Sequence, residues 1–375
     1  MERTLQTKKR NGNIELLRMV CMCMIILLHA LHKGDLLVRI YEVPGVNPYI
    51  AWLLESFSVC AVNTFMLISG YYMSRSRFKL GRLIELVSMV LLYSLASLGI
   101  CLILGIDSLS GKGFNDLLYY FFPVHNRLYW FMTLYILIYI FSPMINRGIE
   151  AMNQKQHKYV IILAVISESL FKSFLPGRFE PEDRGFGFLW LLIVYIIGAY
   201  IRKYGFKFFN SARKGIVTYV IASLLIFAEI LAVQYTNGHY GRLLQASEVS
   251  LDYNHIFVIC AALGLFSYGI NKKPMKEKLT KAVCFFSPMT LGVYLIHENM
   301  SLRYQWQGWL GIRDIIEIHP VLFILKLELA VFTVFAAGML VDYFRIKLFT
   351  FVQRKVSDSP LGRRMERFNS EMNER

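Results

Sequence analysis

The feature that most constrains this chain is a series of apolar runs long enough to cross a lipid bilayer. A bilayer core about 30 Å thick requires roughly 20 helical residues, and the runs are joined by short connections. Only helices and closed barrels satisfy their backbone hydrogen bonds in lipid, and runs of this length indicate helices. We therefore predict an all-α, polytopic integral membrane bundle of about ten transmembrane helices. The expected spans are residues 14–33, 50–72, 84–105, 128–146, 159–175, 186–201, 215–235, 253–270, 283–300 and 320–344.

The composition excludes other classes of protein. Hydrophobic residues make up 55% of the 375 residues and charged residues 18%, whereas soluble domains carry about 25% charged residues. This excludes an ordinary soluble globule, a disordered chain and a disulfide-rich secreted domain. The six cysteines lie inside apolar runs and form no CxxC pair, so we expect neither disulfides nor a metal site. We also expect no permanently bound cofactor.

The distribution of Lys and Arg predicts the orientation of the bundle. Alternate connections and the two tails carry 29 of the 41 basic residues, while the other connections carry 9. Membrane proteins keep Lys and Arg on the cytoplasmic side, so both termini are predicted to be cytoplasmic, in the plasma or inner membrane. The net charge of +15 is then mainly an orientation signal, and nucleic-acid binding is not expected. We expect one membrane domain over 1–375, with a helical core at 14–344 and cytoplasmic tails at 1–13 and 345–375.

Two ionisable residues share one face of the first expected helix. Arg18 and His29 are 11 residues apart, which is three helical turns plus about 20°, with a rise of about 16 Å. Ionisable side chains inside a span usually face an interior cavity, which would place a cation at the inner mouth and an imidazole deep in the bundle. Spacing alone leaves another interpretation open, in which Arg18 reaches the inner headgroups and His29 bonds to a neighbouring helix.

Three other expected helices place side chains at a depth similar to that of His29. These side chains are His297, Glu55 and Trp130, and together they predict a chamber open to the outside. The alternative is that Trp130 belongs to the aromatic belt at the membrane interface, which its position favours, and that His297 is a polar residue at a helix end.

A basic segment connects the second and third expected helices. Residues 74–82 include Arg75, Arg77 and Arg82 and contain no acid. Arg side chains match the geometry of phosphate oxygens, so this segment is a candidate phosphate clamp. The positive-inside rule alone also accounts for it.

Four stretches, in order along the chain, resemble the integral membrane acyltransferases of the type-3 family, which is associated with O-acetylation of cell-surface sugars. The likeness extends over most of the chain. The stretches are Asn13-Ile14-Glu15-Leu16-Leu17-Arg18 through Leu27-Leu28-His29, Asn63-Thr64-Phe65-Met66-Leu67-Ile68-Ser69-Gly70-Tyr71, Tyr129-Trp130-Phe131-Met132 followed by Phe141-Ser142-Pro143-Met144-Ile145-Asn146, and Ser287-Pro288 through Leu291-Gly292-Val293-Tyr294-Leu295-Ile296-His297.

The resemblance implies transfer of an acyl group from cytoplasmic acyl-CoA to an acceptor at the outer face. It implies that His29 is the lead catalytic residue and that Arg18 contacts the donor, with Arg75, Arg77 and Arg82 as further donor contacts. We expect acetyl-CoA as the donor substrate, and a hydroxyl of a cell-surface or lipid-linked carbohydrate as the acceptor.

The expected chemistry assigns further candidate roles. An imidazole with an unperturbed pKa near 6.5 suits general-base work at neutral pH. Glu298 or Glu55 is expected to orient its other nitrogen, and His297 to bind the acceptor or assist proton transfer. A transient acyl-histidine is an alternative to direct transfer. Candidate substrate contacts are Glu55, Asn63, Trp130 and Tyr294, and candidate oxyanion donors are Asn63, Ser69 and Tyr294.

Other functions are compatible with the sequence. A transporter or flippase for a glycan precursor also needs embedded His, Glu and Arg, although no repeated half is apparent. A structural subunit of an envelope polysaccharide machine is a third interpretation. Within the enzyme class, succinyl or a longer acyl group could replace acetyl. The oligomeric state is not readable from the sequence.

Overall fold

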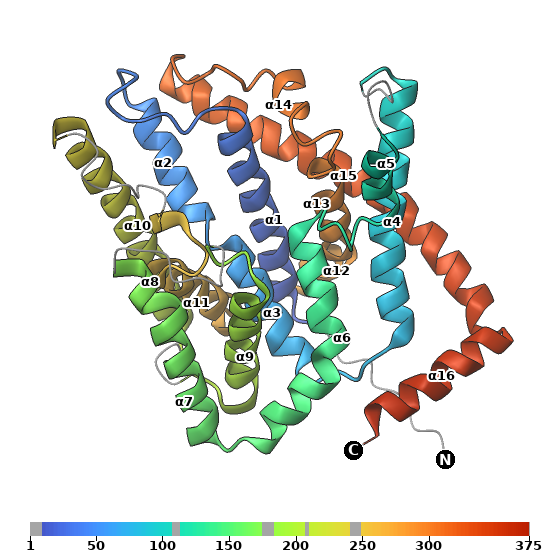
Figure 1. Cartoon of the computed structure of the whole chain (residues 1–375). Helices are drawn as coiled ribbons and strands as arrows, with labels where there is room; N and C mark the ends of the chain where they lie inside the picture. Colours follow the sequence, from blue (N-terminus) through green and yellow to red (C-terminus); the bar gives the residue numbers. More distant parts are fainter. Residues whose placement is uncertain (1–9, 107–112, 175–183, 207–209, 241–248, 375) are drawn as a thin grey trace.

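The computed structural model describes residues 10–106, 113–174, 184–206, 210–240 and 249–374. Within these ranges every regular element is a helix (Figure 1), which confirms the all-α class. The α-helices are α1 (Gly12–Lys33), α2 (Asn47–Ser58), α3 (Ala61–Met73), α4 (Leu80–Ile103), α5 (Phe114–Phe121), α6 (Trp130–Ala151), α7 (Gln154–Val165), α8 (Phe171–Phe174), α9 (Phe188–Tyr204), α10 (Ala212–Tyr240), α11 (Ile256–Asn271), α12 (Glu277–Phe286), α13 (Thr290–His297), α14 (Trp306–Trp309), α15 (Pro320–Ser357) and α16 (Pro360–Asn373).

Among the described residues, seven helical segments are long and apolar enough to cross a membrane. They are 12–33, 47–73, 80–103, 130–151, 212–239, 277–297 and 320–357. The other three expected spans contain the 17-residue α9, the 16-residue α11, and α7 followed by a π-helical turn and α8. The protein is therefore a multi-pass helical membrane protein, while ten crossings and the orientation of the termini remain predictions.

The second expected span is broken into α2 and α3. The hydroxyl of Tyr219, in α10, donates to the Phe57 carbonyl at 2.8 Å, which occupies an acceptor of the helical ladder. The hydroxyls of Ser56 and Thr64 also bond to carbonyls four residues earlier. A side chain inserted into the ladder and such back-bonding both bend helices, which explains the interruption at Val59 and Cys60.

The ninth expected span is broken as well, because Pro288 lies inside it. Proline has no backbone N–H and disrupts the preceding turn, and here a 3-10 turn at Ser287–Met289 separates α12 from α13. The Cys284 carbonyl, freed by the proline, accepts a hydrogen bond from Arg10 at 3.1 Å. Because of this break, α13 is a separate short helix that begins at Thr290 within the bundle.

The end of the chain differs from the expected tail. Residues 345–357 continue α15 to Ser357, and α16 follows after a two-residue turn. The expected tail at 345–375 is therefore mostly helical, and its place outside the membrane stays a prediction. Arg354 and Lys355 lie in the last turn of α15, where cations stabilise the helix dipole.

Close packing between helices depends on small residues. At the crossing of α3 and α9, a methyl group on Gly70 would overlap the Tyr195 carbonyl, and one on Gly198 would overlap the Leu67 carbonyl. In lipid, helices associate through van der Waals contact and hydrogen bonds, so small residues at crossings are favoured.

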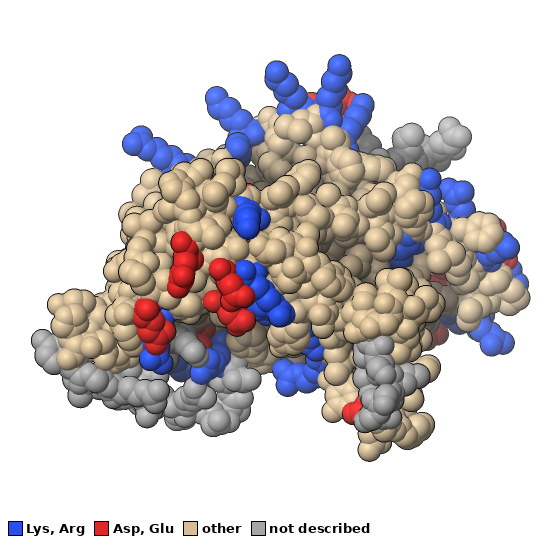
Figure 2. Space-filling view, turned by 90° about the horizontal axis from the view of Figure 1, so that it is seen from above, with Lys and Arg blue, Asp and Glu red and all other residues tan. Residues whose placement is uncertain are grey.

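The two ends of the bundle differ in charge. The end that we call the basic end carries the start of α1, residues 74–79, residues 272–276 and α16 (the lower end in Figure 1). The opposite end carries residues 34–46 and 298–319. Figure 2 looks onto this opposite end, where acidic side chains lie beside basic ones; exposed residues in its loops are Asp35, Arg39, Glu42, Arg313, Asp314 and Glu317.

Candidate active site

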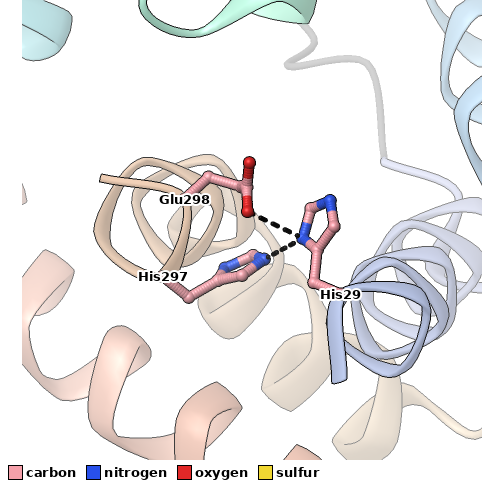
Figure 3. Close-up of side chains that lie close together, drawn as sticks. All are labelled: His29, His297 and Glu298. Atoms are coloured by element: carbon pink, nitrogen blue, oxygen red, sulfur yellow. Dashed lines mark hydrogen bonds and ion pairs between the residues drawn. The ribbon is translucent and has the colours of Figure 1, made fainter. Parts of the chain in front are cut away.

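Two helices far apart in the sequence bring the three predicted catalytic residues together. His29 lies near the end of α1, His297 is the last residue of α13, and Glu298 caps that helix. His29 Nδ1 is 2.9 Å from His297 Nε2 and 3.4 Å from Glu298 Oε1 (Figure 3). His297 is 3% exposed, so this contact lies inside the bundle.

The packing of α13 against α15 holds His297 in place. A methyl group on Gly292 would overlap the Asp342 carboxylate, and one on Gly338 would lie 3.1 Å from the Val293 Cα. Asp342 is fully buried and accepts from the Tyr93 hydroxyl at 2.6 Å. Both glycines therefore permit a helix contact that brings His297 toward α1.

The hydrogen bonds define which nitrogen of His29 carries a proton. His297 Nδ1 lies 2.7 Å from the Val293 carbonyl, an acceptor only, so this nitrogen must be the donor. In the neutral ring His297 Nε2 is then an acceptor, and His29 Nδ1 must donate to it. Glu298 on the same side also favours a proton on Nδ1. Neutral His29 therefore has an unprotonated Nε2, which points away from both partners (Figure 3).

Glu298 is neutralised by a residue that the sequence analysis did not select. Its carboxylate pairs with the Lys33 ammonium, and the two side chains are 11% and 14% exposed. Lys33 is four residues after His29, a spacing that places both on one side of a helix, and this spacing could have identified it.

Glu55 lies in a separate pair. Its carboxylate is 2.9 Å from His32 Nε2, and Glu55 is 1% exposed. Of the two carboxylates left open by the sequence, Glu298 is therefore the one that faces His29. The Glu55 Oε2 atom is buried without a hydrogen-bond partner, so one oxygen is not used by the described protein groups.

His29, His297 and Glu298 also form a set whose ligand atoms lie within 4.8 Å of one another, which raises the question of a metal ion. Two imidazoles on one zinc ion, each bonded at about 2.0–2.1 Å, place their nitrogens about 3.3 Å apart in tetrahedral geometry. The observed 2.9 Å is instead a hydrogen-bond distance. Lys33 adds a positive charge beside Glu298. Both observations favour a hydrogen bond between His29 and His297 over a metal ion bound between them.

His29 lines a narrow cavity with mainly apolar walls. Its volume is about 50 Å³, and Trp130, Tyr253 and Tyr294 also line it. Trp130 stacks on Tyr253 with ring centroids 5.7 Å apart, and Tyr294 is 5% exposed. Trp130 therefore faces the inside of the bundle. Trp130 and Tyr294 are predicted substrate contacts, and Tyr253 is a third aromatic residue beside them that the sequence did not indicate.

Asn63 and Ser69 are bonded to protein groups. Asn63 donates to the Tyr253 carbonyl at 2.7 Å and accepts from Trp190 at 3.0 Å. Ser69 donates to the Phe65 carbonyl at 2.8 Å. Asn63 thus links α3 to α9 and to the segment before α11, and this contact holds the wall of aromatic residues around His29.

A second cavity lies toward the basic end and is rich in arginine. Its volume is about 320 Å³, and we call it the arginine cavity. Its walls come from the N-terminal region, α1, α3, α4, α6, the 3-10 turn, α13 and α15. The arginines that line it are Arg10, Arg18, Arg82 and Arg345.

The predicted phosphate clamp is divided by this geometry. Arg82 lines the arginine cavity, whereas Arg75 and Arg77 are exposed and do not line it. Arg82 follows Leu80, the first residue of α4, so the helix directs it differently from the preceding loop. The expectation that all three form one cluster is therefore not met.

Most of the cavity's arginines have acidic partners. Arg10 pairs with Glu15 at 3.1 Å, Arg82 with Glu85 at 2.9 Å, and Arg345 with Asp342 at 2.6 Å. Arg18 forms no ion pair with the described residues, and its Nε is buried without a hydrogen-bond partner. Its charge is therefore free to bind an anion.

The two cavities share part of their walls. Both are lined by Phe65, Phe131, Thr290 and Leu291, so the route from Arg18 to His29 passes these four side chains. The cavity at His29 has a volume of about 50 Å³, far less than the roughly 320 Å³ of the arginine cavity. Entry of a ligand up to His29 thus requires these side chains to move.

Arg10 and Arg345 were missed because both were assigned to tails. Arg345 has a readable signal, since Asp342 lies three residues before it and i,i+3 pairs of opposite charge meet on a helix. Arg10 has no such readable signal. It donates to the carbonyl of Cys284, which is 274 residues away in the chain and is freed by Pro288.

Comparison with known proteins identifies the family of this chain. A family model described as an acyltransferase domain, acyltransferase family 3, matches residues 11–342. Neither a curated protein nor a solved structure matches the chain. Because the family match includes every helix that contributes to the site except the end of α15, this protein belongs to acyltransferase family 3 and is a multi-pass membrane acyltransferase.

Proposed function

We propose that this protein transfers an acetyl group from cytoplasmic acetyl-CoA to a hydroxyl of a carbohydrate at the outer face of the cell membrane. The observation that carries this proposal is the engaged Nδ1 of His29, which leaves Nε2 unprotonated on a residue that lines a cavity sharing its walls with the arginine cavity. The basic end is the cytoplasmic end in this proposal, because it gathers the Lys and Arg of alternate connections.

The donor binds from the basic end. The nucleotide part of acetyl-CoA carries several phosphate charges and cannot enter lipid, so it occupies the arginine cavity near Arg18, Arg82 and Arg345. The pantetheine arm is thin and nearly uncharged, and it displaces Phe65 and Phe131 as it passes toward His29. The rise of about 16 Å between Arg18 and His29 on α1 suits an arm of that kind.

The acyl transfer follows from the tautomer of His29. Nε2 removes the proton from the acceptor hydroxyl while the oxygen attacks the thioester carbonyl carbon. The C–S bond then breaks, and the imidazolium returns its proton to the coenzyme A thiolate, so that an ester and a free thiol are the products. His297 and Glu298 stabilise the imidazolium through Nδ1. Direct transfer needs one imidazole, and an acyl-histidine intermediate would appear as ping-pong kinetics.

The acceptor approaches from the opposite end. Trp130, Tyr253 and Tyr294 line the cavity at His29 and offer aromatic rings to a sugar. The mixture of exposed acidic and basic residues at this end (Figure 2) is compatible with a polar acceptor.

The test uses purified protein in lipid vesicles with acetyl-CoA labelled in its acetyl group. We expect the label to reach a glycan acceptor with the wild type and not with His29→Ala. His125→Ala is the matched control, because His125 is exposed in the loop before α6. Transfer by His29→Ala, or transport of a glycan with no label transferred by any variant, would rule out the proposal. Mass spectrometry of surface glycans from cells with and without the gene identifies the acceptor.

A further inference from the structure

The C-terminal helix α16 lies outside the matched family domain and connects two walls of the arginine cavity. Arg82, Glu85 and Met89 line the cavity from α4, and Arg345, Ile346, Phe349, Thr350 and Gln353 line it from α15. Two residues separate the end of α15 from the start of α16. Its far end contacts the segment that precedes α4 (Figure 1).

The contact with α4 is made by two asparagines through backbone hydrogen bonds. Asn369 Oδ1 accepts from the Leu80 N–H at 2.6 Å, and Leu80 is the first residue of α4. Asn373 Oδ1 accepts from the Phe78 N–H at 2.8 Å, and its Nδ2 donates to the Phe78 carbonyl at 2.9 Å. The first N–H groups of a helix have no partner within it, so Asn369 acts as an N-cap supplied from 289 residues away.

Side chains reinforce this contact. Phe78 is 5% exposed and lies between Tyr139 of α6 and Phe368 of α16, with ring centroids 5.2 and 6.4 Å away. The Tyr139 hydroxyl exchanges hydrogen bonds with the backbone of Lys79 at 3.1 Å. The segment at 78–80 is therefore held on both sides, and Arg82 follows it by half a helical turn.

Polar side chains also join the same two walls directly. Arg345 of α15 lies 3.7 Å from Glu85 of α4, and Asp342 accepts from Tyr93 of α4 at 2.6 Å. Both contacts lie beyond the first turn of α4, whereas α16 contacts α4 at its first residue, Leu80. α16, with 14 residues, is about 21 Å long, long enough to reach from the end of α15 to the start of α4.

We propose that α16 is a brace that positions the arginine cavity for the donor, with Asn369 and Asn373 as positioning residues. Without the brace, the start of α4 loses its cap and the wall that carries Arg82 moves relative to α15. The phosphates of the donor then meet Arg82 and Arg345 in varied positions, and donor binding weakens. His29 and its partners are not displaced, because α13 is held by Gly292 and Gly338. This inference rests on the proposed function for the identity of the donor.

The experiment measures two properties of the full-length protein in nanodiscs: amide hydrogen exchange at 78–82, and the Kd for acetyl-CoA. The double variant Asn369→Leu/Asn373→Leu removes all three hydrogen bonds. We expect faster exchange at Phe78 and Leu80 and a Kd raised about fivefold or more, the range expected when a helix cap is lost. Asn369→Asp keeps the acceptor at the helix N-terminus, where a negative charge is favourable, and should bind acetyl-CoA like the wild type.

Glu366→Ala/Ser370→Ala is the matched control, since both residues are exposed on α16. The effect must also act through Arg82, so the double leucine variant should raise the Kd less in an Arg82→Ala background than in the wild type. Unchanged exchange, an unchanged Kd, or an equal Kd increase in both backgrounds would each overturn the brace. Failure of the proposed function looks different: acetyl-CoA binds, the brace variant weakens it, and His29→Ala still transfers label.

Discussion

His29 and His297 form a hydrogen bond whose direction is set by a third group. His297 Nδ1 lies 2.7 Å from the Val293 carbonyl, so His297 presents an acceptor to His29 Nδ1 at 2.9 Å. The backbone of α13 thereby determines the tautomer of a residue on α1. In the proposed mechanism this bond makes His297 a positioning residue for the base, a narrower role than the acceptor binding or proton transfer expected from sequence.

Replacement of His297 by Phe should lower kcat with little change in the KM for acetyl-CoA. The phenyl ring keeps most of the volume but offers no acceptor, so His29 loses the partner that selects its tautomer. Loss of a correctly oriented base costs about 10² to 10⁴ in rate. The measurement is steady-state kinetics with labelled acetyl-CoA. A wild-type kcat for His297→Phe would contradict the positioning role, and His125→Ala serves as the control.

Lys33→Met should destabilise the protein, because it leaves the Glu298 carboxylate buried without its cation. Breaking a buried ion pair by removing one partner costs about 3–5 kcal/mol. The measurement is the thermal unfolding midpoint in detergent. Adding Glu298→Gln removes the unpaired charge and should recover most of the lost stability. An unchanged midpoint in Lys33→Met, or no recovery in the double variant, would show that the pair contributes little.

Arg18→Ala should raise the KM for acetyl-CoA by about tenfold or more, since a hydrogen bond to a charged group contributes about 1.5–3 kcal/mol. Arg75→Ala/Arg77→Ala should change this KM less than about twofold, because exposed charges contribute about 0–1 kcal/mol and neither residue lines the arginine cavity. Kinetics at constant ionic strength separates the two cases. Equal effects of both variants on the KM would indicate that the donor also binds at the exposed loop that carries Arg75 and Arg77.

Leu291→Trp should block acyl transfer and leave acetyl-CoA bound. Leu291 lines both cavities, and the larger side chain should obstruct passage between them without removing an arginine. We expect a loss of kcat of about 100-fold, the size seen when reacting groups are kept apart by about an ångström. Leu325→Trp is the control, because Leu325 is 58% exposed on α15. Normal turnover by a stably folded Leu291→Trp would mean that the thioester reaches His29 by another route.

The sequence by itself determined the helical membrane class and the pair on α1. Apolar runs near 20 residues leave helices as the structure that satisfies the backbone in lipid, and a spacing of 11 residues places Arg18 and His29 on one face. The interruption between α12 and α13 at Pro288 also has a local cause, because proline lacks a backbone N–H. These features depend on neighbouring residues along the chain, which is why they are readable without coordinates.

The tertiary structure decided which residues act with that pair. Glu298 and not Glu55 faces His29, Arg345 and Arg10 and not Arg75 and Arg77 complete the arginine cavity, and Asn369 caps a helix that begins 289 residues earlier. Each of these depends on how helices distant in sequence cross, and the crossings depend on close contacts such as Gly292 against Asp342. Charge and hydropathy patterns specify which segments enter the membrane, whereas side-chain volume at the crossings selects their neighbours.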